Sequence, residues 1–326
     1  VSTENNNFLF REYSSLTDFD LLDEEEQSLA LQYRNKKVYG TGLGTSVNWD
    51  IDITGRGKIY NDFFPEVEVP SMDFSVPSNS GIDKETLSMR FLSDLDETLK
   101  EEKLSRLKTV IDAYDTWINE LIKKKSTLEP QFDKIATANI AGCQSACSRM
   151  LEGLHVLERN DMAWSAFLLA NRAMFMQRIH LKLQEQTSNI DRYPGDKELS
   201  DILDSLDYAD PKGLTGDNHF WRLFQIAFLL MSIESIVNDA SPQREIVDLI
   251  WFPTGGGKTE AYLGIIALTI INRRRTQGTK GEGTAALMRY TLRLLTTQQF
   301  QRALRLIMAL EQIRLWGNAN YNLGNA

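Results

Sequence analysis

The residues Phe252–Thr259 have the composition of a loop that binds the phosphates of a nucleotide. The run contains three consecutive glycines, Gly255, Gly256 and Gly257. Without Cβ atoms, their backbone N–H groups can approach an anion closely. Lys258 would then reach the β and γ phosphates and the Thr259 hydroxyl would bind Mg²⁺, so these two residues are the predicted catalytic pair. Phe252 occupies the first glycine position of the general G-x-x-x-x-G-K-[ST] pattern, and the alternative is a glycine turn that merely precedes Lys-Thr.

A second pair of candidate residues precedes this loop and would recognise the base of the nucleotide. Arg222 and Gln225 have the R-x-x-Q spacing found in superfamily 2 helicases, where the glutamine amide pairs with the edge of adenine. This similarity predicts that both residues bind the nucleotide and that the nucleotide is ATP. The alternative is a glutamine on the polar edge of a helix.

A third group follows the loop and is similar to helicase motif Ia. Arg293 and Gln298 keep the R-x-L-x-x-Q spacing of that motif, which lies beside the nucleic-acid strand in helicases. Arg289 and Arg302 supply nearby cations for contacts with phosphates that do not depend on sequence. We therefore expect these four residues to contact DNA. The alternative is an amphipathic helix with solvated arginines.

These groups need elements that position them, and the apolar pattern predicts an α/β arrangement. Glu245–Phe252 and Thr284–Tyr290 resemble strands of a parallel sheet, and Ala261–Arg275 and Thr296–Trp316 resemble the helices that follow them. Residues 216–326 would form the incomplete beginning of a first RecA-like lobe. We expect a helical module before it, over residues 82–215, because apolar residues recur there with helical spacing.

Residues 1–81 are predicted to form a small module that contains β-structure. Val47, Trp49, Ile51 and Ile53 alternate with polar residues, as in half-buried strands, and a Gly-Arg-Gly turn follows at residues 55–57. An acidic start at Asp23 predicts a short helix up to Arg34.

Composition excludes several classes of function. The chain has 326 residues, of which 42% are hydrophobic and 25% charged, so a soluble, folded protein is expected. Two cysteines and three scattered histidines give no zinc site or disulfide framework. No apolar run is long enough for a membrane span and no secretory signal is visible, so the expected location is the cytoplasm, with no membrane partner. The net charge is −9, yet residues 241–326 hold 11 Lys and Arg against 5 Asp and Glu, which favours a polyanion there.

Six longer phrases are spread along the chain: TGLGTSVNWD (Thr41–Asp50), FFPEVEVPSM (Phe63–Met72), AFLLANRAMFMQ (Ala166–Gln177), FWRLFQIAFLL (Phe220–Leu230), FPTGGGKTEAYLG (Phe252–Gly264) and LMRYTLRLLTTQQFQRA (Leu287–Ala303). Together they resemble DrmA-like superfamily 2 helicases of DISARM anti-phage defence systems. This resemblance implies an ATP-driven motor of bacteria that acts on foreign DNA and assembles with a DrmB-like defence protein.

The sequence departs from that family at the groups that hydrolyse ATP. No hydrophobic strand ending in Asp-Glu follows the loop, and the acidic residues after Glu260 are Glu282 and Glu311. Arginine fingers and a second lobe are missing as well. We therefore expect a fragment that binds ATP weakly and hydrolyses it negligibly by itself. Two alternatives stay open: a translocase that moves on duplex DNA as chromatin remodellers do, and a nucleotide-responsive scaffold of a defence complex that does not hydrolyse ATP.

Overall fold

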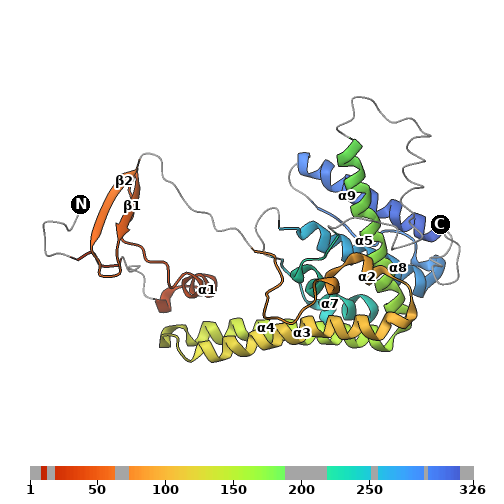
Figure 1. Cartoon of the computed structure of the whole chain (residues 1–326), viewed down its shortest axis with the longest axis horizontal. Helices are drawn as coiled ribbons and strands as arrows, with labels where there is room; N and C mark the ends of the chain where they lie inside the picture. The colour runs from red at the N-terminus through yellow and green to blue at the C-terminus, as the bar shows by residue number, and fades with distance from the viewer. Residues whose placement is uncertain are drawn as a thin grey trace. The chain divides into compact units, whose positions relative to one another are not determined.

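The computed structural model describes residues 9–12, 19–62, 73–187, 219–250, 256–289 and 293–315, with side chains except those of residues 182–187 and 293–296. The described part is mostly helical (Figure 1). It divides into two compact units, which we describe separately. Unit 1 comprises residues 1–71 and 118–143, and unit 2 comprises residues 72–117 and 144–326.

Unit 1 contains the predicted β-structure. Strands β1 (Ser46–Ile51) and β2 (Gly57–Asp62) pair antiparallel, with Trp49 opposite Ile59. The turn between them is closed by Asp52, whose carboxylate accepts hydrogen bonds from Thr54 and from the backbone N–H of Arg56. These hydrogen bonds lower the pKa of Asp52, and the bond from the Thr54 hydroxyl has the largest effect. The alternating pattern therefore predicted the hairpin, but β1 ends two residues before Ile53, which lies exposed in the turn, and Gly57 belongs to β2.

A short helix and the adjoining ends of two long helices complete unit 1. Helix α1 (Glu24–Gln32) begins after Asp23, whose side chain accepts from the backbone N–H of Glu26, as the acidic start predicted. Helices α3 (Lys100–Lys125) and α4 (Asp133–Arg159) contribute residues to both units. The single-turn helices η1 (Phe19–Leu21) and η4 (Pro130–Phe132) lie beside a small core of Leu31, Phe132, Ile135 and Ala136.

Unit 2 is built around helix α5 (Asp161–Thr187), which is buried on all sides over residues 166–177. Its neighbours include α2 (Met89–Ser93), α8 (Lys258–Gln277) and α9 (Arg293–Leu315) (Figure 1). Helix α7 (Leu223–Val237) packs on α8. The remaining elements are the single-turn helices η2 (Lys84–Leu87), η3 (Glu97–Leu99), η6 (Pro242–Glu245) and η7 (Gly278–Gly281).

Close backbone contacts and buried polar groups fix the helices of unit 2. A Cβ atom at Gly153 on α4 would lie 2.0 Å from the carbonyl oxygen of Leu230, so α4 and α7 meet where only glycine fits. A Cβ at Gly264 on α8 would lie 2.9 Å from the ring of Trp221. The side chain of Lys103 is fully buried and donates to the carbonyl oxygen of Asp94, and this burial lowers its pKa to about 8.

The start of α7 is held by residues that are distant in sequence. Trp221 N–H donates to the Leu87 carbonyl at 2.7 Å, and Met89 N–H donates to the His219 carbonyl at 2.9 Å. The buried Trp221 indole N–H donates to Asn171 Oδ1 on α5 at 2.7 Å. Residues 219–221 are therefore fixed by α5 and by the segment that leads into α2.

The parallel strands predicted over Glu245–Phe252 and Thr284–Tyr290 are not formed in the parts of these segments that the structure describes. Residues 246–250 and 284–289 are irregular, and the hairpin is the only sheet among the described residues. The predicted burial is also absent, since Val247 is 95% exposed and Leu287 is 73% exposed. An apolar run becomes a buried strand only when neighbouring strands accept its hydrogen bonds and cover its faces.

Other boundaries differ less from the prediction. Helices α8 and α9 begin three residues earlier than expected, at Lys258 and Arg293. Asp161 is the first residue of α5, and the N–H of Ala163 donates the capping hydrogen bond to Asn160 Oδ1. None of the described helices is long and apolar enough to cross a bilayer.

Candidate nucleotide and nucleic-acid site

The glycine run leads into the first turn of α8. Gly257 has a φ of 82°, in the left-handed region, and occupies the N-cap position, so Lys258 and Thr259 are the first two residues of the helix. The first N–H groups of a helix have no partners within it and form an anion site together with the helix dipole. Gly256 is buried beside Gly257. Residues 251–255, which include Phe252 and Gly255, lie outside the described residues.

Gln225 lies directly against this turn. Its Nε2 donates to the carbonyl oxygen of Gly257 at 2.7 Å, and its Oε1 accepts from the backbone N–H of Arg222 at 2.8 Å. The side chain is 4% exposed. These two bonds leave one lone pair on Oε1 as an acceptor and one hydrogen on Nε2 as a donor. An acceptor and a donor side by side are what the edge of adenine requires. The structure thus brings Gln225 and the glycine run together, although sequence reasoning gave no sign of the bond between them.

Arg222 also lies at the loop. Its guanidinium group lies 3.7 Å from the ring centroid of Phe74, in a cation–π arrangement. Its Nη1 atom is buried, has no hydrogen-bond partner among the described residues, and lies 3.5 Å from the position of a Cβ at Gly257. A positive charge is therefore held next to the proposed phosphate site. Phe74, which sequence reasoning did not select, carries no motif that would have identified it.

Glu260, in the first turn of α8, connects three helices. Its Oε1 lies 3.3 Å from Nη1 of Arg302 on α9 and 3.9 Å from Nη1 of Arg178 on α5. The Glu260 side chain is 13% exposed and that of Arg302 is 33% exposed. Arg302 was predicted to contact DNA, and in the structure its guanidinium group binds the carboxylate next to the glycine run instead of extending into solvent.

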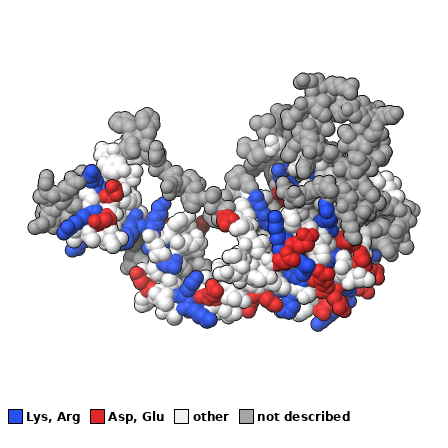
Figure 2. All heavy atoms as spheres, viewed as in Figure 1, with Lys and Arg blue, Asp and Glu red and all other residues white. Residues whose placement is uncertain are grey.

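The other predicted DNA-contacting residues are placed differently. Arg289 and Gln298 are exposed and available to a ligand, and Arg293 is the first residue of α9, with its side chain outside the described atoms. Figure 2 shows Lys and Arg interspersed with Asp and Glu over the face in view.

The segment that precedes the glycine run is held by a buried arginine. Arg149 of α4 donates from Nη1 and Nη2 to both carboxylate oxygens of Asp248, at 2.6 and 2.7 Å. Its Nε donates to Gln243, whose amide in turn donates to Glu152. Arg149 is 8% exposed, and the hydrogen bonds to Asp248 raise its pKa. Helix α4 is thereby fixed to the chain just before the loop.

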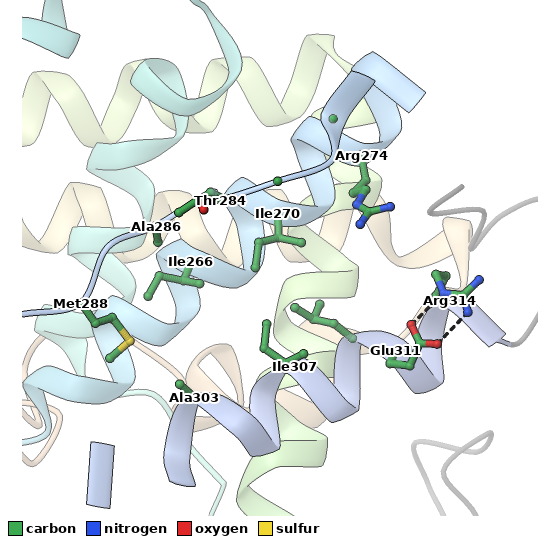
Figure 3. Close-up of a pocket in the computed structure, with 14 residues that line it drawn as sticks. Ile266, Ile270, Arg274, Thr284, Ala286, Met288, Ala303, Ile307, Glu311 and Arg314 are labelled. Atoms are coloured by element: carbon green, nitrogen blue, oxygen red, sulfur yellow. Dashed lines mark hydrogen bonds and ion pairs between the residues drawn. The ribbon is translucent and has the colours of Figure 1, made fainter. Parts of the chain in front are cut away.

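A cavity of about 380 Å³ lies between α8, α9 and the irregular segment 281–288 (Figure 3). At one end, Glu311 pairs with Arg314, and this hydrogen bond lowers the pKa of Glu311. Arg274 and Thr284 also line the cavity, and the other lining side chains are apolar, which does not suit a polyphosphate. The apolar lining comes from Ile266, Ile270, Ala285, Ala286, Met288, Ala303, Ile307 and Leu310. The cavity is therefore separate from the candidate nucleotide site.

The described residues contain no cluster of three or more His, Cys, Asp or Glu side chains that could hold a metal ion. Cys143 and Cys147 are free thiols on α4. Burial, with Asp115 and Asp112 nearby, raises the pKa of Cys147, which lowers its reactivity. Thr259, the residue predicted to bind Mg²⁺, is the second residue of α8 and directly follows Lys258.

Comparison with known proteins relates the chain to a bacterial DISARM defence system. It is 34% identical over 298 residues to DISARM protein DrmA of Bacillus paralicheniformis. The match covers 88% of this chain and 24% of the relative, so the chain spans about a quarter of that protein. The chain is DrmA-like over the matched residues, which confirms the resemblance to DrmA found in the sequence. No protein-family model matches the chain.

Proposed function

We propose that the chain binds ATP and Mg²⁺ at the start of α8 and DNA beside the start of α9, as part of an anti-phage helicase or translocase. The observation that carries this proposal is the bond from Gln225 to the carbonyl of Gly257, which joins the predicted adenine-reading segment to the predicted phosphate loop. Two motifs far apart in the sequence thus lie at one place, with Lys258 and Thr259 in the same turn.

The proposal includes the RecA-like fold that the sequence predicts. Segments 246–250 and 284–289 are irregular and carry exposed apolar side chains, Val247, Leu249 and Leu287 among them. Such residues become buried when further strands of a parallel sheet cover them. The matched DrmA is about four times longer than the aligned region, so a longer protein of this kind has enough chain to supply those strands.

At the nucleotide, the residues of this chain would bind and orient rather than cleave. The backbone N–H groups of the first turn of α8 would bind the phosphates, and Lys258 would balance the charge of the β and γ groups. Mg²⁺ would be held by the Thr259 hydroxyl and the phosphates, and it supplies charge neutralisation during phosphoryl transfer. Hydrolysis needs a base that orients water. In this class of enzyme we expect that base from a strand ending in Asp-Glu, and no such strand follows the loop in this sequence. The proposed partners are DNA and a DrmB-like defence protein, as the similarity to DrmA suggests.

The test is equilibrium binding of a fluorescent ATP analogue and of labelled DNA to the 326-residue chain. We expect Lys258→Ala to weaken nucleotide binding at least about tenfold, as loss of a charge-assisted contact to phosphate would do. We expect Arg289→Gln to reduce the slope of log affinity for DNA against log salt by about one. Lys108→Gln, on the exposed face of α3, is the matched charge control. Nucleotide binding that Lys258→Ala leaves unchanged would refute the assignment of the loop.

A further inference from the structure

The carboxylate of Glu260 lies where two proposed binding sites meet. Glu260 is in the first turn of α8, two residues after Lys258, and its Oε2 lies 3.5 Å from the position of a Cβ at Gly257. Its Oε1 lies 3.3 Å from Arg302, which is on α9, the helix that begins at Arg293. One ion pair therefore joins the nucleotide-binding turn to the helix that carries the DNA-facing segment.

We propose that the Glu260–Arg302 ion pair couples nucleotide binding to DNA binding, and that Arg302 is a positioning residue which acts through Glu260. This inference rests on the proposed function. Because the Glu260 side chain is 13% exposed, its interaction with Arg302 is screened by water less than a surface pair would be. A ligand that orders the first turn of α8 therefore also orders Arg302 and the helix that carries it.

The packing of α8 and α9 supports this role. The two helices also line the 380 Å³ cavity, with Ile266 and Ile270 of α8 on one side and Ala303 and Ile307 of α9 on the other (Figure 3). Interdigitated side chains would fix one arrangement of the helices, and the cavity leaves room for a second arrangement. The ion pair at Glu260 sets how α9 is held at the end near the loop.

Arg178 provides a comparison within the same cluster. It approaches Glu260 from α5, at 3.9 Å, and α5 carries none of the residues predicted to contact DNA. Removing Arg178 should therefore change the charge around Glu260 without breaking the connection between the two sites.

The experiment measures the affinity of the 326-residue chain for a fluorescent, non-hydrolysable ATP analogue, without DNA and with saturating DNA. We expect DNA to tighten nucleotide binding about fivefold or more in the parent chain, a common size for coupling between sites. The coupling ratio, which is the nucleotide affinity with DNA divided by that without DNA, should fall below about two in Arg302→Gln and in Glu260→Gln. It should keep its parent value in Arg178→Gln. By reciprocity, the nucleotide should lose its effect on DNA affinity in the same two variants.

Salt dependence separates this role from direct contact with DNA. If Arg302 acts through Glu260, Arg302→Gln should keep the parent slope of log DNA affinity against log salt, whereas Arg289→Gln should lower it by about one. A slope lowered by Arg302→Gln, or a coupling ratio that Arg302→Gln leaves at the parent value, would overturn the inference. A parent chain that binds both ligands without coupling would also overturn it, and a parent chain that binds no nucleotide would refute the proposed function itself. Arg302→Lys keeps the charge and should retain most of the coupling, so the comparison of Arg302→Gln with Arg302→Lys carries the test if Glu260→Gln does not fold.

Discussion

The substitution Gly257→Ala tests whether the backbone at the start of α8 is built for a ligand. A Cβ at this position would lie 2.7 Å from Nε2 of Gln225, and the φ of 82° is one that side chains other than glycine rarely adopt. The left-handed conformation costs about 1–2 kcal/mol for a residue with a Cβ atom. Displacing the Gln225 amide breaks its bond to Gly257 and leaves a buried polar group, which costs about 1–3 kcal/mol more.

The sum, about 2–5 kcal/mol, is large enough to measure. If the nucleotide needs this loop conformation, we expect Gly257→Ala to weaken binding of the ATP analogue at least about thirtyfold, since about 1.4 kcal/mol corresponds to a factor of ten. Gly283→Ala is the matched control, because Gly283 also has a positive φ, of 94°, but a Cβ there meets nothing within 4 Å. Gly283→Ala should lower the thermal stability because of its backbone strain, but its nucleotide affinity should stay within about twofold of that of the parent chain.

A double variant identifies the cause of the loss. Replacing Gln225 by Ala removes the atom that the new Cβ would strike, so the added effect of Gly257→Ala should be smaller in Gln225→Ala than in the parent chain. Fluorescence titration gives the affinities and thermal unfolding confirms that each variant is folded. The reasoning fails if Gly257→Ala binds the analogue as tightly as Gly283→Ala does.

Three further predictions concern stability and are checked by urea unfolding. Arg149→Ala leaves the carboxylate of Asp248 without its two hydrogen bonds. Because this ion pair is largely but not fully buried, we expect the free energy of unfolding to fall by about 2–4 kcal/mol. An unchanged urea midpoint would contradict the role of the pair. Gly153→Ala should force α4 and α7 apart and lower the free energy of unfolding by at least about 2 kcal/mol. The control is Gly142→Ala on the same helix, where the added Cβ meets open space and should raise the free energy of unfolding by up to about 1 kcal/mol. Equal effects of the two substitutions would argue against the close contact at Gly153. Burial lowers the pKa of Lys103 to about 8, so between that pH and its unfolded value of 10.5 the unfolded chain binds more protons and the folded state gains stability as pH rises. Lys103→Met should remove this rise, and the same pH slope in both proteins would contradict it.

Local patterns in the sequence predicted the local structure. The alternation from Val47 to Ile53 is sufficient for a hairpin, because a turn closed by neighbouring residues needs no partner from elsewhere in the chain. Helix α1 follows from the acidic residues at its start. In each of these cases, the groups that fix the element lie within a few residues of it.

Interactions between distant residues could not be predicted in this way. The run Glu245–Phe252 is apolar enough for a buried strand, yet its state depends on neighbouring strands and not on its own pattern. The bonds from Gln225 to Gly257 and from Arg302 to Glu260 likewise depend on how α7, α8 and α9 pack. Arg302 therefore looked like a solvent-facing cation in the sequence, because a glutamate on another helix gives no local signal.

The contacts that hold residues 219–221 have a practical consequence for protein engineering. This short segment is bonded to Leu87, Met89 and Asn171, all of which precede α5 or belong to it. These hydrogen bonds hold the start of α7, and with it the candidate site, against α5 and the segment before α2. Two separately expressed pieces, residues 1–187 and 219–326, should find each other by complementation, as the halves of a split reporter do.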